Sequence, residues 1–286
     1  MKKWWLSLRP FSFTASIIPM LLGLAIAAEQ TAINLVGAAL AVAAGLTLHI
    51  IANIFNSYYD WKYGHDRPGD QQVVPLLLDP RLGESALYWY GVCFFILGII
   101  FTIVLGIMYN STVFLITLVG LFNAYFYTAP PIAYKKRGLA LPSVFISMGI
   151  LMPLNTYFVQ VSNLTLKILL CPIPLAVLVT AILQSNELRD YGADLRHGIR
   201  SLTVVYGIKV GIKFYQFLIL SPYILTPLLI SAGLVPWFGG IVFITIPYAL
   251  KLIRKADLHE FISLDAATAK LHAAFGILYT IALIMQ

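Results

Sequence analysis

The chain has 286 residues, of which 60% are hydrophobic and only 11% are charged. A soluble domain carries roughly a quarter charged residues, so this composition excludes an ordinary soluble protein and indicates one that lies in lipid. The two cysteines, Cys93 and Cys171, fall in separate apolar runs, which predicts neither a disulfide framework nor a zinc site.

Apolar stretches of about the length that a bilayer requires follow one another along the whole chain. The nine predicted spans are residues 11–28, 33–57, 86–108, 111–128, 139–161, 166–186, 207–230, 235–253 and 266–285. The first of them has no convincing cleavage site after it, so we expect a retained helix rather than a signal peptide. The sequence therefore predicts an all-α, polytopic membrane protein.

The basic residues support both the number of spans and their orientation. Of the nineteen Lys and Arg residues, all except Lys167 fall at the N-terminus or near the connections that follow even-numbered spans. Because basic loops stay in the cytoplasm, we expect a multi-pass protein of the cell membrane with a cytoplasmic N-terminus. All acidic residues except Glu29 lie on that same side. The positive-inside rule does not explain this second asymmetry.

A polar stripe ends the second predicted span, in the stretch LHIIANIFNSYYD. His49, Asn53, Asn56 and Asp60 are spaced four, three and four residues apart, so on a helix they fall within about 60° of one another. Polar groups in a membrane helix are costly unless they face other helices or a water-filled cavity. His49 and Asn53 lie deeper, and each either makes helix–helix hydrogen bonds or touches a ligand.

The sixth predicted span ends in a similar pattern, NELRDYGADLRHGIRSLTVVYG. Asn186, Asp190 and Asp194 follow at four-residue spacing, much as Asn56 and Asp60 do in the first pattern.

The two patterns terminate spans that are four helices apart, which predicts two parallel pseudo-repeats, about residues 11–128 and 139–253, followed by a ninth helix. We expect residues 1–286 to form a single transmembrane domain.

The chemistry of these residue types points to a metal and a phosphate. Carboxylates and amide oxygens are hard ligands suited to Mg²⁺, which usually shares its coordination shell with phosphates. Two such clusters facing each other would hold Mg²⁺ ions bridged by one diphosphate, and nearby cations would stabilise the diphosphate as a leaving group. An apolar cavity below would suit a lipid tail. The plain alternative is that these acids only balance neighbouring Lys and Arg residues.

Four stretches of the chain resemble the UbiA superfamily of intramembrane aromatic prenyltransferases, and together they run over nearly the whole sequence. They are LRPFSFTASIIPMLLGLAIA from Leu8, NSYYDWKYGHD from Asn56, YTAPPIAYKKRGL from Tyr127 and NELRDYGADLRHGIRSLTVVYG from Asn186. The N-x3-D-x3-G-x-D form of the second stretch is more typical of the menaquinone branch, the 1,4-dihydroxy-2-naphthoate prenyltransferases, than of the 4-hydroxybenzoate branch.

The resemblance implies a nine-helix bundle around a central apolar cavity, capped by cytoplasmic loops. It implies Mg²⁺-dependent transfer of a polyprenyl group from a polyprenyl diphosphate to a small aromatic acceptor within the lipid bilayer, with 1,4-dihydroxy-2-naphthoate as the favoured acceptor. We expect no nucleic acid and no obligatory protein partner. Other acceptors remain open, namely 4-hydroxybenzoate, homogentisate, a glycerophosphate ether lipid or a porphyrin, and so do a secondary transporter and a non-catalytic prenyl-lipid-binding protein.

The resemblance also assigns roles to individual residues. The implied metal ligands are Asn56, Asp60, Asp190 and Asp194. The implied catalytic residues are Asp60, Asp190, Lys135 and Tyr134, the last two binding or polarising the diphosphate. The implied substrate-binding residues are Arg9, Asn53, Asn56, Asp66, Asn186, Arg189 and Arg200. Arg81 stands in a loop that departs from the usual pattern, and whether it replaces the displaced cation of that loop is left open by the resemblance.

Overall fold

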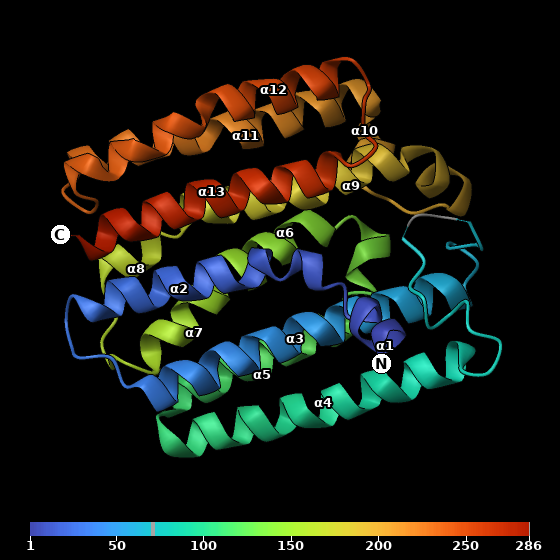
Figure 1. Ribbon diagram of the computed structural model, residues 1–286, viewed down its shortest axis with the longest axis horizontal. Helices are drawn as coiled ribbons and strands as arrows, with labels where there is room; N and C mark the ends of the chain where they lie inside the picture. The colour runs from blue at the N-terminus through green and yellow to red at the C-terminus, as the bar shows by residue number, and fades with distance from the viewer. Residues whose placement is uncertain (70–71, 286) are drawn as a thin grey trace.

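The computed structural model describes residues 1–69 and 72–285, and these residues form helices and connecting loops with no strand among them (Figure 1). The elements of the first half are α1 (Lys2–Ser7), η1 (Pro10–Ser12), α2 (Thr14–Ala28), α3 (Leu35–Lys62), α4 (Gly83–Met108), α5 (Ser111–Phe126) and η2 (Tyr134–Arg137). Those of the second half are α6 (Ala140–Val144), η3 (Phe145–Leu151), α7 (Met152–Phe158), α8 (Leu166–Leu170), α9 (Ile173–His197), α10 (Leu202–Tyr206), α11 (Ile208–Ser231), η4 (Trp237–Thr245), α12 (Ile246–Asp257) and α13 (Leu264–Ile284).

The predicted all-α membrane fold is confirmed. Eight helical segments in the described part of the chain are long and apolar enough to cross a bilayer. The remaining predicted span coincides with α5, which has 16 residues and is therefore about 24 Å long, a little short of the bilayer core. It packs against α3 and α4. The protein is thus a multi-pass membrane protein.

Polar capping residues mark where several of these helices begin. The side-chain oxygen of Asn34 accepts a hydrogen bond from the backbone N–H of Gly37 at the start of α3, and that of Asn110 does the same for Val113 at the start of α5. Such caps satisfy backbone donors that a helix cannot pair internally. They fix the short turns that let consecutive helices run in opposite directions.

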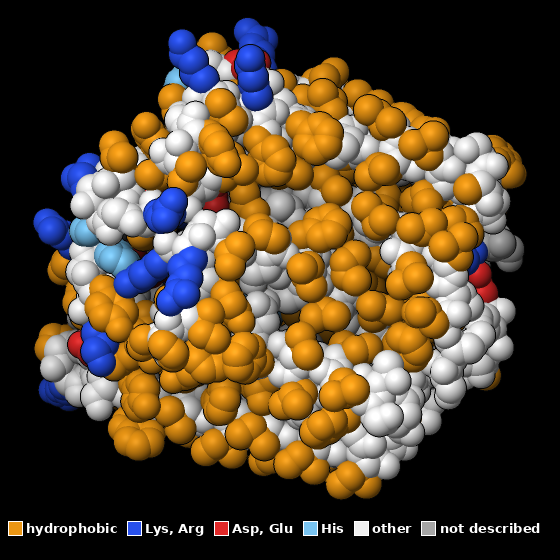
Figure 2. All heavy atoms as spheres, turned by 180° about the vertical axis from the view of Figure 1, so that it is seen from behind, with side chains coloured by type: hydrophobic (Ala, Val, Ile, Leu, Met, Phe, Trp, Pro, Cys, Tyr) orange, Lys and Arg blue, Asp and Glu red, His pale blue; other side chains and the backbone are white. Residues whose placement is uncertain are grey.

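The two helices that carry the acidic patterns finish at the same end of the bundle, on the right of Figure 1. Both are longer than the predicted spans, since α3 continues to Lys62 and α9 to His197. Between them, α2 packs against α7 and α13, and α13 packs against α9. Figure 2 shows Lys and Arg side chains gathered mostly toward this end of the molecule, with hydrophobic side chains over the broad middle.

A close helix contact depends on Gly23 in α2. A Cβ atom added there would clash with the carbonyl oxygen of Pro153 and the hydroxyl of Thr156, both in α7. Because the backbone of α7 cannot move away cheaply, we expect Gly23→Ala to lower the free energy of unfolding by about 1–3 kcal/mol. Thermal unfolding in detergent measures this. Gly240→Ala is the matched control, since its Cβ would lie 4.0 Å from the nearest atom. An equal loss of stability in Gly240→Ala would contradict the role of the contact between Gly23 and α7.

Candidate active site

A cavity of about 730 Å³ lies inside the bundle, with charged residues on some walls and apolar residues on others. Its polar lining includes Arg9, Asn53, Asn56, Asp60, His65, Asp66, Tyr127, Lys135, Asn186, Glu187, Arg189, Asp190, Asp194, His197 and Asp265. Its apolar lining includes Met20, Leu48, Ile116, Val144, Met148, Leu151, Met152, Val179, Ile182 and Leu183. The arrangement can hold a charged head group next to a hydrophobic chain.

The polar stripe of α3 meets the loop that follows α5. The Lys135 Nζ lies 2.6 Å from the Oδ2 of Asp60 and donates a hydrogen bond of 3.2 Å to the Oδ1 of Asn56. His65 Nδ1 lies 3.5 Å from the other oxygen of Asp60. Burial lowers the pKa of Lys135, but the carboxylate of Asp60, together with Tyr127 and Asp194, outweighs burial and raises this pKa above its usual value. Lys135 is therefore a fixed positive charge at this site.

The loop places Lys135 by folding back on the end of α5. The backbone N–H of Lys135 donates to the carbonyl of Tyr127 at 2.9 Å, and Ala133 just before η2 has a left-handed backbone with φ of +46°. Tyr127, at the end of α5, then lines the cavity itself.

The acidic pattern of α9 is held by an arginine fork. Arg189 donates from Nε and Nη2 to the two carboxylate oxygens of Asp190, both at 2.8 Å, and from Nη1 to the carboxylate of Asp265. Asp265 lies in the first turn of α13. Bidentate guanidinium–carboxylate pairs are strong and directional, so this fork fixes where Asp190 points and ties α9 to α13.

Two oxygens at this end of the cavity have no partner. Asp66 Oδ2 and Asn186 Oδ1 are buried and make no hydrogen bond within the described residues. Burial, followed by the nearby charge of Asp60, raises the pKa of Asp66. A buried polar atom left unpaired requires an explanation such as a bound ion. Carboxylate and amide oxygens from α3, α9 and the loop after α3 are the donor set that Mg²⁺ prefers, so these residues fit that ion.

The oxygen atoms that could bind a metal come from two separate sets of residues and do not form one complete metal-binding site. Across residues 1–69 and 72–285, no three His, Cys, Asp or Glu side chains lie close enough together to hold a metal ion by themselves. Mg²⁺ is usually held by one or two carboxylates together with substrate phosphates. The arrangement therefore suits ions that share their ligands with a bound diphosphate.

Most of the predicted site residues are brought to the cavity. Those that line it are Arg9, Asn53, Asn56, Asp60, Asp66, Lys135, Asn186, Arg189, Asp190 and Asp194. Tyr134 is half-buried and does not line the cavity, and Arg200 and Arg81 are exposed outside it. Their roles in binding the diphosphate stay predictions.

Five ionisable residues of the lining had been given no role in the metal or diphosphate site: His65, Tyr127, Glu187, His197 and Asp265. Four of them lie inside the motifs, where a signal was present: Tyr127 begins one quoted stretch, and Glu187 stands between Asn186 and the second acidic pair. Asp265 had no such signal, because it precedes the last predicted span by one residue.

Comparisons with known proteins show which family the chain belongs to. Residues 16–275 match the UbiA prenyltransferase family. The chain is 32% identical to UbiA prenyltransferase domain-containing protein 1 of Gallus gallus, over 98% of this chain and 84% of that protein. It is 27% identical to the 1,4-dihydroxy-2-naphthoate octaprenyltransferase of Bacillus subtilis (strain 168), over 99% of this chain and 92% of that protein.

Among solved structures, the fold is similar to that of a UbiA homolog from Archaeoglobus fulgidus bound to GPP and Mg²⁺. The TM-score is 0.67 at 16% identity, over 99% of this chain and 100% of that one. This structural similarity shows the fold alone. The match to the family is a match of sequence and covers residues 16–275. The chain therefore belongs to the UbiA prenyltransferase family and is a prenyltransferase.

Proposed function

We propose that this protein transfers a polyprenyl group from a polyprenyl diphosphate to 1,4-dihydroxy-2-naphthoate, in a Mg²⁺-dependent step of menaquinone biosynthesis. The observation that carries the proposal is the meeting of two Asn/Asp sets, from α3 and α9, at one cavity that is otherwise largely apolar. The Archaeoglobus fulgidus homolog bound to GPP and Mg²⁺ supports the donor and the metal. The name of the Bacillus subtilis relative supports the acceptor.

Asn56 and Asp60 on one side, and Asp190 and Asp194 on the other, would hold the metal. Mg²⁺ bound there would neutralise the negative charge that develops on the departing diphosphate. Lys135, already fixed beside Asp60, supplies a further positive charge for the same purpose.

The apolar part of the lining surrounds the prenyl chain and the aromatic ring that react. The apolar walls hold the prenyl chain and exclude water, which would otherwise capture the allylic carbocation before the aromatic ring does. Holding donor and acceptor in one cavity also removes the entropic cost of bringing them together. Asp66 and Asn186, with their unpaired oxygens, support the ligand set.

The basic loops suggest where the protein lies. We place it in the cell membrane, with the N-terminus and the charged end of the cavity on the cytoplasmic side, because positively charged loops stay in the cytoplasm. We also propose that α2–α5 and α6–α12 are parallel pseudo-repeats and that α13 follows as the last helix.

The proposal is tested by turnover of the purified protein in detergent. With geranylgeranyl diphosphate and Mg²⁺, we expect prenylated product from 1,4-dihydroxy-2-naphthoate and little from 4-hydroxybenzoate or homogentisate. Excess EDTA should abolish the product, and added Mg²⁺ should restore it, because the diphosphate leaves poorly without a metal. Product is measured by mass spectrometry. Undiminished turnover in EDTA would contradict the requirement for Mg²⁺. Product from 4-hydroxybenzoate alone would show that this compound, rather than 1,4-dihydroxy-2-naphthoate, is the acceptor.

A further inference from the structure

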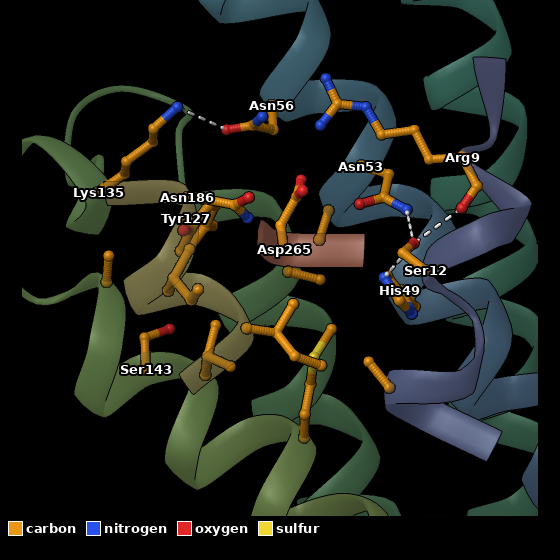
Figure 3. A pocket seen from close by; sticks show the side chains of 18 of the residues that line it. Arg9, Ser12, His49, Asn53, Asn56, Tyr127, Lys135, Ser143, Asn186 and Asp265 are labelled. Carbon is orange, nitrogen blue, oxygen red and sulfur yellow. Dashed lines mark hydrogen bonds between the residues drawn. The ribbon is translucent and has the colours of Figure 1, made fainter. Parts of the chain in front are cut away.

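One wall of the cavity carries a hydrogen-bond network between α3 and the turn that joins α1 to α2. The Nδ2 of Asn53 donates to the carbonyl oxygen of Leu8 at 3.1 Å and to the hydroxyl of Ser12 at 3.2 Å. An amide nitrogen has two hydrogens, and this turn uses both of them. The amide oxygen of Asn53 is left as a hydrogen-bond acceptor, and Figure 3 shows it pointing away from Ser12 toward Asp265 across the cavity.

The same network uses both ring nitrogens of His49 in hydrogen bonds within the protein, so His49 does not bind a ligand. The hydroxyl of Ser12 donates its one hydrogen to the carbonyl of Arg9 at 2.8 Å, so it must accept from Asn53 and from His49 Nε2, which lies 3.2 Å away. His49 Nε2 therefore carries the ring hydrogen, and Nδ1 accepts from the hydroxyl of Ser16 at 2.6 Å. Both ring nitrogens are used.

Arg9 differs from the two other cationic residues that have been described at the cavity. Lys135 is paired with Asp60, and Arg189 with two carboxylates. The guanidinium of Arg9 donates from Nη2 to the carbonyl of Gln72 at 2.8 Å, and no carboxylate within the described ranges lies at ion-pair distance from it. A guanidinium has five N–H donors, so Arg9 has donors to offer an anionic ligand.

The backbone at Arg9 is also unusual. Its φ is +58°, in the left-handed region that residues other than glycine rarely adopt. Such conformations persist where the surroundings hold them, and they cluster at ligand sites. Here the hydroxyl of Ser12 holds the carbonyl of Arg9, and Ser12 is held in turn by Asn53. The network thus builds one wall of the cavity, to which Arg9 contributes a cation and Asn53 a neutral acceptor oxygen (Figure 3).

We infer that Arg9 and Asn53 form the subsite that selects the aromatic acceptor, an inference that rests on the proposed prenyl transfer. The guanidinium of Arg9 binds a carboxylate on the ring, and the amide oxygen of Asn53 accepts a hydrogen bond from a ring hydroxyl. Ala15, Leu48 and Ala52 line the cavity too and offer an apolar surface to the ring. The ligand class is an aromatic acid that carries a hydroxyl group.

The test measures equilibrium binding to the purified protein without Mg²⁺ or any diphosphate. The probes are 4-hydroxy-2-naphthoate, 1-naphthol, which lacks the carboxylate, and 4-methoxy-2-naphthoate, which lacks the hydroxyl hydrogen. We expect the parent to prefer the hydroxynaphthoate over 1-naphthol by about 10- to 100-fold, as a hydrogen bond to a charged group provides. Arg9→Gln should remove most of that preference.

Asn53→Ala should instead keep the preference for the carboxylate and lose the preference for hydroxyl over methoxy. Ratios are compared within each variant, so a general loss of stability cancels. Arg137→Gln is the matched control: its Nη2 also donates to a backbone carbonyl at 2.8 Å, that of Pro131, but it does not line this cavity. It should bind all three probes like the parent.

An unchanged preference for the carboxylate in Arg9→Gln would overturn the subsite, and so would a parent that shows no such preference. In a separate titration with inorganic diphosphate, weaker binding by Arg9→Gln, with the preference for the carboxylate intact, would also overturn it, because Arg9 would then bind the prenyl donor. Because the binding assay contains neither metal nor prenyl donor, its result stands apart from any failure of the transfer reaction. Product formed by a parent without the preference would overturn the subsite alone.

Discussion

Replacing Asp60 or Asp190 with asparagine should lower the rate of prenyl transfer by about 100-fold or more, because each change removes one carboxylate from an opposing half of the site. Asparagine keeps the shape of aspartate but not its charge. The two halves come from α3 and α9, so neither can replace the other. Initial rates at saturating geranylgeranyl diphosphate, measured over a range of Mg²⁺ concentrations, should show a higher metal requirement as well.

Asp257→Asn is the control for these two variants. Asp257 ends α12, is exposed, and accepts a hydrogen bond of 2.7 Å from the side chain of Gln216. It lies outside the cavity lining, so its loss should change the rate by no more than about twofold. A full rate in either Asp60→Asn or Asp190→Asn would contradict the paired-metal assignment.

The membrane spans and the acidic patterns were predictable because their signals are local in the sequence. An apolar stretch of bilayer length, and the four-residue spacing of Asp190 and Asp194, can be read from a single segment of chain. The helix ends were harder to predict. Hydropathy placed the end of the sixth span at residue 186, where polar residues begin, yet α9 continues to His197. Several of those polar residues face the cavity, and hydropathy does not report direction.

The contacts that complete the site depend on packing between distant segments. Lys135 and Asp60 are 75 residues apart in the sequence, and Arg189 and Asp265 are 76 residues apart. The sequence placed Lys135 at the site through a family motif, without naming its partner. Asp265 lies in the first turn of α13, where an acidic side chain suits the helix dipole and needs no further role. Only the packing of α13 against α9 gives it a further role.

Tyr127 and Tyr134 show, within one loop, that the sequence does not tell which side chain faces the cavity. The family resemblance selected Tyr134 because it stands next to Lys135 in the motif. In the structure the chain folds back, so that the backbone of Lys135 bonds to that of Tyr127, and it is Tyr127 that lines the cavity. A sequence motif gives the order of residues along the chain, whereas the turn decides which side chains share a wall.

Lys135→Met should both stop the reaction and destabilise the protein, and the two effects can be separated. The Asp60 side chain is 5% exposed and that of Lys135 is 24% exposed, with 2.6 Å between their charged atoms. Removing one partner leaves a buried charge uncompensated, which costs about 3–5 kcal/mol. We expect a correspondingly lower thermal midpoint in detergent, together with a rate at least about 100-fold lower.

Lys136→Met provides the matched control, because the neighbouring Lys136 lies with its Nζ 3.9 Å from the centre of the Tyr63 ring rather than beside a carboxylate. Losing that cation–π contact should cost only about 0.5–2 kcal/mol and leave most of the activity.

The double variant Asp60→Asn with Lys135→Met separates the effect of the Asp60–Lys135 pair on stability from its effect on activity. With both charges gone, the buried pair is replaced by neutral groups, and most of the lost stability should return. Activity should not return, because the site still lacks one metal ligand and one cation for the diphosphate. Recovery of stability without activity would therefore assign the Asp60–Lys135 pair to the chemistry as well as to the fold. A single Lys135→Met variant that is inactive yet as stable as the parent would show that Asp60 is neutralised in some other way.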